Sequence, residues 1–221
     1  MPEDDKPLAL VTGASRGIGA ATAKLLATKG YHVLLTARTE GALEEVEDEI
    51  HASGGTATLA PFDLTDGEAT ARLAQAVAAR WGRLDVLIMN AAMLGDLTPV
   101  PHIDDKAFQD IFKLNVIANF HLLKVFDPLL KAAPKADIVA LTSSVADDPR
   151  AYWGAYAASK AALANLVRTY VDEVANLGTV SAHIYNPGGT ATRMRAEAYP
   201  GEDRSKLRTP EEVAADIVDL L

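Results

Sequence analysis

The chain alternates short apolar runs with longer amphipathic segments from end to end. Apolar residues dominate six short runs, at residues 8–12, 31–36, 56–60, 84–89, 138–142 and 180–185. Such runs are typical of strands that are buried on both faces. The segments between them have helical spacing, at residues 17–29, 40–52, 66–81, 104–131 and 152–175. This alternation predicts an α/β fold with one doubly wound parallel sheet of about six strands, flanked by helices.

Local signals predict where several helices begin and end. Thr65 and Glu68 have the spacing of a capping box, and so has the segment 209–212, which also places a proline at the first helical position. Pro128 is expected to kink or end the long helix near Asp127, because proline has no amide hydrogen and its ring clashes with the preceding turn.

Three irregular stretches, 90–103, 145–151 and 187–208, each follow a predicted strand. Open parallel sheets bind ligands at the carboxyl ends of their strands, so these stretches are expected to surround the site. We predict one domain over residues 1–221, a disordered tail at 1–6 and a substrate-binding loop at 187–208.

Composition removes several classes of function. The 221 residues carry a formal net charge of -9, which argues against nucleic acid as the main partner. There is no cysteine, and the five histidines show no metal-ligand spacing, so no metal site is predicted. The chain has no apolar stretch of about 18 residues and its first residues are acidic, so we expect a cytoplasmic protein without a membrane span.

A glycine-rich turn, Thr12-Gly13-Ala14-Ser15-Arg16-Gly17-Ile18-Gly19, joins the first predicted strand to the first helix. Glycines let the backbone approach a ligand closely, and a helix N-terminus offers free N–H groups to a pyrophosphate. The turn therefore predicts dinucleotide binding, although a plain strand-to-helix turn would look similar. The predicted contacts are Gly13, Ser15, Arg16, Gly17, Ile18 and Gly19.

The end of the second strand bears on which dinucleotide is bound. NAD-selective sites place an acid there for the ribose 2′-hydroxyl, whereas this chain has Arg38. Arg16 lies within reach of the same place, and two guanidiniums suit a 2′-phosphate. Glu40 is assigned to the first turn of a helix capped by Thr39. We therefore expect NADP(H), with NAD possible; the alternative is two solvated arginines.

Tyr156 and Lys160 share one face of a predicted helix, because they are four residues apart. The phenol pKa of about 10 is high for a base near neutrality, and a neighbouring ammonium is expected to lower it. The pair is thus a candidate acid/base device for a carbonyl group. Taken alone, this spacing is frequent by chance and would indicate two helix-surface residues.

The motifs together resemble the classical subgroup of the short-chain dehydrogenase/reductases, over residues 7–194. The resemblance is carried, in order along the chain, by 12–19, Asp63-Leu64, Asn90-Ala91-Ala92, Asn115, Ser143-Ser144, 156–160 and Asn186-Pro187-Gly188. It implies a Rossmann fold and an oxidoreductase that transfers a hydride between NADP(H) and a carbonyl or secondary alcohol.

The resemblance also implies a role for each matching residue. Tyr156 would be the general acid/base, Lys160 would lower its pKa and hold the nicotinamide ribose, Ser144 would bond the substrate oxygen, and Asn115 would hold a water that feeds protons through Lys160. Asp63 would contact the adenine, Asn90 the adenine ribose region and Thr192 the carboxamide. Further cofactor contacts implied are Leu64, Ala91, Pro187, Gly188 and Thr190.

Some features depart from the family pattern. Ala92 replaces a usual glycine, and Ser144 lies one residue nearer to Tyr156 than expected, so Ser143 is the alternative catalytic serine. The chain stops at Leu221, where relatives add a seventh strand. We therefore expect a homodimer that forms through the two long helices. The expected small-molecule partner is a carbonyl compound or an alcohol. The alternatives are a dinucleotide-binding regulatory or scaffold protein, or a truncated, poorly active dehydrogenase.

Large apolar side chains in the irregular stretches are expected to rim the substrate site, or else only to pack there. They are Met93, Leu94, Tyr152, Trp153, Met194 and Tyr199. If several line the pocket, the substrate is at least partly apolar.

Overall fold

The computed structural model describes residues 6–221, so residues 1–5 of the predicted tail lie outside the described part. Lys6, the last residue of that predicted tail, is anchored to the sheet. Its ammonium donates to Thr56 Oγ1 at 3.2 Å, and its carbonyl accepts from the Arg83 guanidinium at 3.3 Å.

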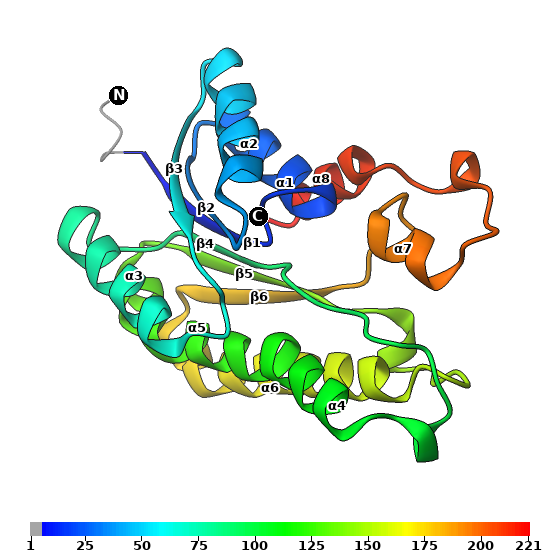
Figure 1. The fold of residues 1–221 in the computed structure, drawn as a ribbon. Coiled ribbons are helices and arrows are strands. Elements are labelled where there is room, and N and C mark those ends of the chain that lie inside the picture. The colour runs from blue at the N-terminus through cyan, green and yellow to red at the C-terminus, as the bar shows by residue number, and fades with distance from the viewer. Residues whose placement is uncertain (1–5) are drawn as a thin grey trace.

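Six parallel strands form one sheet in the order β3-β2-β1-β4-β5-β6 (Figure 1). Their bounds are β1 Leu8–Thr12, β2 His32–Ala37, β3 Thr56–Pro61, β4 Val86–Met89, β5 Ala136–Leu141 and β6 Val180–Tyr185. Val11 of β1 pairs with Leu35 of β2 on one side and with Ile88 of β4 on the other. The strand order reverses at this point, which is where an open sheet forms a ligand crevice. The predicted fold is confirmed.

Helices cover both faces of the sheet, as Figure 1 shows. One face carries α1 (Gly17–Thr28), α2 (Glu40–Ala52) and α8 (Pro210–Asp219). The other carries α3 (Gly67–Arg80), α4 (Asp105–Phe112), α5 (Ala118–Ala132) and α6 (Gly154–Val174). The short helix α7 (Arg193–Ala198) lies beyond the carboxyl ends of the strands.

Two apolar cores lie on the two sides of the sheet, because successive strand residues point to opposite faces. Leu10 and Phe126 belong to the core under α3, α5 and α6, whereas Val11, Leu26 and Ile217 belong to the core under α1, α2 and α8. Burial on both faces explains why the strands are apolar at nearly every position.

The long helix predicted at 104–131 is interrupted, but proline does not cause the interruption. A π-helical turn at Lys113–Ile117 separates α4 from α5, and α5 continues past Pro128 to Ala132. Pro128 therefore does not end the helix near Asp127, and the alternative that it kinks the helix stays a prediction. Pro128 and Lys124 are both exposed, so water can bind the Lys124 carbonyl that the proline leaves without an amide partner.

The cap predicted for α3 was off by one residue. Asp66, not Thr65, is the N-cap, and its carboxylate accepts from the amides of Glu68 and Ala69 at 2.9 and 3.0 Å. The Thr65 hydroxyl instead donates to Asp63. An aspartate at the next position competes for the same amides, and sequence spacing alone does not rank the two caps.

The last helix begins as predicted. Thr209 and Glu212 form a reciprocal capping box, with bonds of 3.2 and 2.7 Å. The buried face of α8 packs chiefly against α1. A bond of 2.7 Å from the Tyr185 hydroxyl to Asp216 links α8 to β6. In residues 6–221 the sheet has no seventh strand.

Candidate active site

A cavity of about 1100 Å³ lies at the carboxyl ends of the strands, where the strand order reverses. Fourteen of the residues predicted for the site line it. They are Gly13, Ser15, Arg16, Gly17, Ile18, Arg38, Asp63, Leu64, Asn90, Ala91, Tyr156, Lys160, Pro187 and Thr192. The structure thus brings the glycine turn, the arginine that follows β2 and the Tyr/Lys pair of α6 around a single space.

Three predicted cofactor residues do not line this cavity but shape its walls. A Cβ on Gly19 would lie 2.3 Å from the Gly13 carbonyl oxygen, so this glycine permits the tight turn. Thr190 is buried and donates to the Pro187 carbonyl at 3.2 Å. Gly188 takes a left-handed conformation with a φ of 67°, which favours glycine. Their predicted contacts with the cofactor stay predictions.

Asn90 holds the glycine turn against the end of β4. Its amide nitrogen donates to the carbonyls of Thr12 and Gly13 at 2.8 and 3.2 Å. The Thr12 hydroxyl in turn accepts from the backbone amides of Asn90 and Ala91 at 3.0 Å. A Cβ on Gly13 would come within 2.9 Å of the Asn90 amide, so glycine is what allows this close packing.

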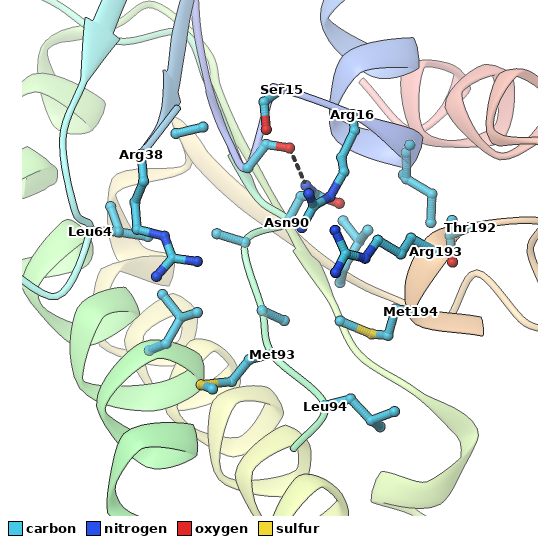
Figure 2. A pocket seen from close by; sticks show the side chains of 18 of the residues that line it. Ser15, Arg16, Arg38, Leu64, Asn90, Met93, Leu94, Thr192, Arg193 and Met194 are labelled. Carbon is cyan, nitrogen blue, oxygen red and sulfur yellow. Dashed lines mark hydrogen bonds between the residues drawn. The ribbon is translucent and has the colours of Figure 1, made fainter. Parts of the chain in front are cut away.

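Cationic side chains enter the cavity from several elements. Arg38 and Arg16 enter from opposite sides of Asn90 in Figure 2. Arg38 is the only charged residue among the four at 36–39 that line the cavity where β2 ends. Thr39 is the N-cap residue of α2, as predicted, but its side chain makes no capping bond.

Asp63 contributes a carboxylate to the Arg38 side of the cavity. The Thr65 backbone N–H is the main cause that lowers the pKa of Asp63, and the charges of Arg38 and Lys113 lower it further. The aspartate is therefore ionised at neutral pH and lies near both cations. The carboxylate of Asp63 and these two cations thus lie near one another at the β2 end of the cavity.

The sequence analysis missed some of the charged lining residues, among them Lys113, Arg193 and Glu197. Arg193 directly follows Thr192, so its place in the loop was the one signal available. Lys113 reaches the cavity from the π-helical turn, which the helical spacing did not reveal.

Tyr156 and Lys160 are both nearly inaccessible to solvent, with exposed fractions of 7% and 2%. Burial raises the pKa of Tyr156 to about 12 and lowers the pKa of Lys160 to about 8. The expected lowering of the tyrosine pKa by the lysine is thus not what this structure gives. The reason is geometric: Lys160 Nζ lies 5.9 Å from the tyrosine ring centre and donates to the Leu141 carbonyl at 2.7 Å.

Asn115 lies in the π-helical turn and joins three segments near the site. Its Oδ1 accepts from the Met93 amide and its Nδ2 donates to the Met93 carbonyl, both at 2.9 Å. Nδ2 also donates to Ser159 Oγ at 3.0 Å, and that hydroxyl donates to the Tyr156 carbonyl at 2.7 Å. Asn115 does not line the cavity, so its implied role in holding a water stays a prediction.

The two candidate serines follow β5, and neither lines the cavity. Ser144 begins a short 3-10 turn, Ser144–Ala146, and its hydroxyl accepts from Arg150 Nη2 at 3.4 Å. Ser143 is the extended residue before that turn. The choice between the two serines therefore remains open.

An apolar group covers the outer side of Tyr156. Its buried members are Leu94, Val145, Tyr156 and Ala157, with Leu97, Trp153, Met194 and Ala198 packed against them. The Trp153 ring meets Tyr156 edge-on at 5.9 Å and lies 5.8 Å from the Tyr199 ring. Most of the predicted rim residues thus lie near the tyrosine, whereas Tyr152 points to solvent, being 58% exposed.

Comparison with known proteins identifies the family to which the chain belongs. A model of the short chain dehydrogenase family matches residues 7–203. The chain belongs to this family. It is an oxidoreductase with a dinucleotide-binding fold.

Relatives agree with this assignment over nearly the whole chain. The uncharacterized oxidoreductase YciK of Escherichia coli is 38% identical over 214 residues, which cover 96% of this chain and 82% of that protein. A putative short chain dehydrogenase from Pseudomonas syringae superposes with a TM-score of 0.91 at 40% identity, covering 96% of this chain and 87% of the other. A putative short chain dehydrogenase from Escherichia coli CFT073, complexed with NADPH, has a TM-score of 0.88 at 38% identity, covering 100% and 91%.

Within residues 6–221, no helix combines the length and the apolar character that crossing a membrane requires.

Proposed function

We propose that this short-chain dehydrogenase/reductase transfers a hydride between NADP(H) and a carbonyl compound or its secondary alcohol. One observation supports this most directly: Tyr156 and Lys160 line the same cavity as the glycine turn and Arg38. The regulatory or scaffold alternative would be favoured by loss of the tyrosine or the lysine, and the chain has both.

The residues around the cavity fit a nicotinamide dinucleotide carrying a 2′-phosphate. The turn before α1 supplies backbone N–H groups for the pyrophosphate. Arg38 offers a guanidinium where the 2′-phosphate would lie, and residues 36–39 contain no acid to repel it. The relative from Escherichia coli CFT073 that was crystallised with NADPH supports the same cofactor. When bound, NADPH supplies the hydride.

The protein's own part in the reaction is to supply a proton and to stabilise charge. Because burial raises the pKa of Tyr156 to about 12, its phenol is protonated at neutral pH and can donate to a carbonyl oxygen that is gaining negative charge. Lys160, with its pKa lowered to about 8, is the nearest group able to return a proton. A hydroxyl from Ser144 or Ser143 would donate a second hydrogen bond to the same oxygen.

Cofactor titration tests the first half of the proposal. NADPH should bind at least about tenfold more tightly than NADH, since a charge-assisted contact contributes roughly 1.5–3 kcal/mol. Arg38→Ala should reduce this ratio, whereas Arg168→Ala, at an exposed arginine of α6, should not. Fluorescence titration of both cofactors measures the ratio, and equal affinities in the wild type would contradict the NADP preference.

Turnover tests the second half. Purified protein should consume NADPH with members of a panel of ketones, aldehydes and quinones. Tyr156→Phe keeps the ring but removes the proton, so it should bind NADPH normally and lose turnover. If that variant keeps near-normal turnover, Tyr156 is not the general acid. A wild type that binds NADPH but reduces nothing would favour the scaffold alternative.

A further inference from the structure

The Arg150 guanidinium bonds two residues that lie next to the apolar group over Tyr156. Arg150 Nη2 lies 3.4 Å from Ser144 Oγ, and its Nη1 lies 3.5 Å from the Tyr199 hydroxyl. Arg150 thus connects the loop after β5 with Tyr199, the residue that follows α7.

This cation has no acidic partner, in contrast to three arginines of the segment after β6. Arg193, Arg195 and Arg208 form ion pairs with Glu197, Glu202 and Asp216. Arg150 forms no ion pair with any carboxylate in residues 6–221, including the exposed Asp147 and Asp148 of its own loop. Within residues 6–221, its side-chain hydrogen bonds go only to two neutral hydroxyls, both at the long end of hydrogen-bond distance.

A guanidinium in this position is suited to a carboxylate. It has five N–H donors in a planar fork that matches a carboxylate with two parallel bonds, and hydroxyls use this capacity poorly. Two members of that apolar group, Leu94 and Met194, also line the cavity together with Tyr156. A ligand that fills this space would place an apolar chain against that surface and an anion on Arg150.

From this arrangement we infer that the substrate is an oxo acid, held by its carboxylate on Arg150 while its carbonyl oxygen faces Tyr156. The inference rests on the proposed function and names its substrate class. Because Arg150 contacts Ser144, one of the two candidate catalytic serines, the carboxylate belongs within a few bonds of the carbonyl. The carbonyl carbon would accept a hydride from NADPH and its oxygen a proton from Tyr156, giving the hydroxy acid and NADP⁺.

The test compares 2-oxo and 3-oxo acids of increasing chain length with their methyl esters. In the wild type, kcat/KM should be higher for the acid than for its ester. Arg150→Ala should lower kcat/KM for the acid by at least about tenfold, the effect of losing one charge-assisted contact. The same change should leave kcat/KM for the ester within about threefold of the wild-type value. Arg150→Lys should restore part of the kcat/KM lost for the acid, because lysine keeps the positive charge.

Two controls separate this role from a structural one. Arg168→Ala removes the same charge from an exposed site on α6 and should change neither kcat/KM. NADPH affinity should be unchanged in Arg150→Ala, because the loop's bond from the Trp153 amide to the Arg150 carbonyl does not involve the side chain.

Several outcomes overturn the inference. An equal loss of kcat/KM for acid and ester in Arg150→Ala would mean that Arg150 contacts the reacting oxygen or supports the conformation of the loop, and does not bind the carboxylate. A wild type that prefers esters, or that reduces other carbonyls but no oxo acid, would exclude an oxo acid substrate and leave the proposed function standing. If no carbonyl compound of any kind is reduced, the proposed function fails together with this inference.

Discussion

Lys160 keeps an ionisable amine almost wholly buried at the base of the cavity, with the Leu141 carbonyl as its hydrogen-bond acceptor. Burial of a charged group costs free energy unless partners replace the lost water. Burial lowers the pKa of Lys160 to about 8 because it disfavours the charged ammonium. Near neutrality the folded protein still carries that ammonium, in surroundings that destabilise it. The lysine is therefore present at the expense of stability, as expected of a residue kept for chemistry rather than packing.

Lys160→Met should accordingly stabilise the fold while abolishing turnover. Below the folded-state pKa the wild type bears the full cost of a buried ammonium. As pH rises from about 8 to 10.5, the unfolded chain keeps the proton that the folded chain has lost, so wild-type stability rises. The variant lacks this dependence. At neutral pH it should be about 1–2 kcal/mol more stable, after allowing for the lost bond to Leu141.

Urea unfolding of both proteins across this pH range measures the difference. The difference in unfolding free energy between variant and wild type should become smaller as pH rises above about 8. A gap that is absent at neutral pH, or that widens at alkaline pH, would show that the lysine is not a buried cation in the folded protein.

The two serines make a second prediction at the residue scale. Ser144→Ala should lower kcat roughly 10²–10³-fold, the usual loss of a donor to developing oxyanion charge, while Ser143→Ala should have a much smaller effect. Steady-state kinetics of both variants decide the assignment. If Ser143→Ala is the more damaging change, the serine nearer to β5 is the catalytic one.

At the scale of elements, the π-helical turn is what connects the loop after β4 to the helix that carries Tyr156. Asn115 supplies the connection, since it bonds both backbone groups of Met93 and the Ser159 hydroxyl, which continues to the Tyr156 carbonyl. Asn115 is fully buried, so water cannot replace these bonds when the side chain is removed.

Asn115→Ala should therefore cost at least about 2 kcal/mol of unfolding free energy, because several buried polar groups lose their partners. It should also weaken NADPH binding, since Met93 lines the cavity. Asn119→Ala is the matched control: that amide is equally buried, but its Oδ1 already has no partner, so a smaller loss is expected. Equal losses in the two variants would show that Asn115 is only one buried amide among others.

Sequence patterns predicted the elements well where a signal is local. Apolar runs gave the strands, and Thr209 with Glu212 gave the start of α8, because both depend on neighbours within a few positions. The π-helical turn escaped prediction because its bonds join Asn115 to Met93, 22 residues away. Pro128 was misinterpreted as a possible helix end because its effect depends on its surroundings in the folded protein, where it lies on the exposed side of α5.

The residues of the candidate site likewise divide into those that a local motif reveals and those that it does not. The glycine turn, Arg38 and the Tyr156/Lys160 pair were found from motifs, and the structure brings them to one cavity. The pKa of Tyr156 was not foreseen, because its burial depends on Leu94 and Met194, which come from other parts of the chain. Arg193 was missed because the orientation of α7 has no sequence motif.

At the scale of the whole molecule, two surfaces are candidates for association between copies of the chain. The β6 edge has a groove whose apolar lining includes Val167, Ala182 and Ile184, but Arg168 and Asp172 also line it. The run from α4 to α5 instead presents large apolar side chains. Phe108, Ile117 and Phe120 are 38%, 47% and 44% exposed, which is costly for side chains of this size in a single copy.

We therefore expect a two-fold dimer through α4, α5 and the neighbouring α6, since a self-complementary patch on one face closes with two copies. Light scattering on the purified protein should give twice the chain mass of 23.4 kDa. Phe120→Glu should shift the protein toward the monomer, because each copy would bury a charge in the interface. Leu177→Glu, at a similarly exposed apolar residue after α6, should leave the dimer intact. A wild-type monomer would contradict a role for the helix face in association, and a tetramer would indicate that a second surface, such as the β6 edge, is also used.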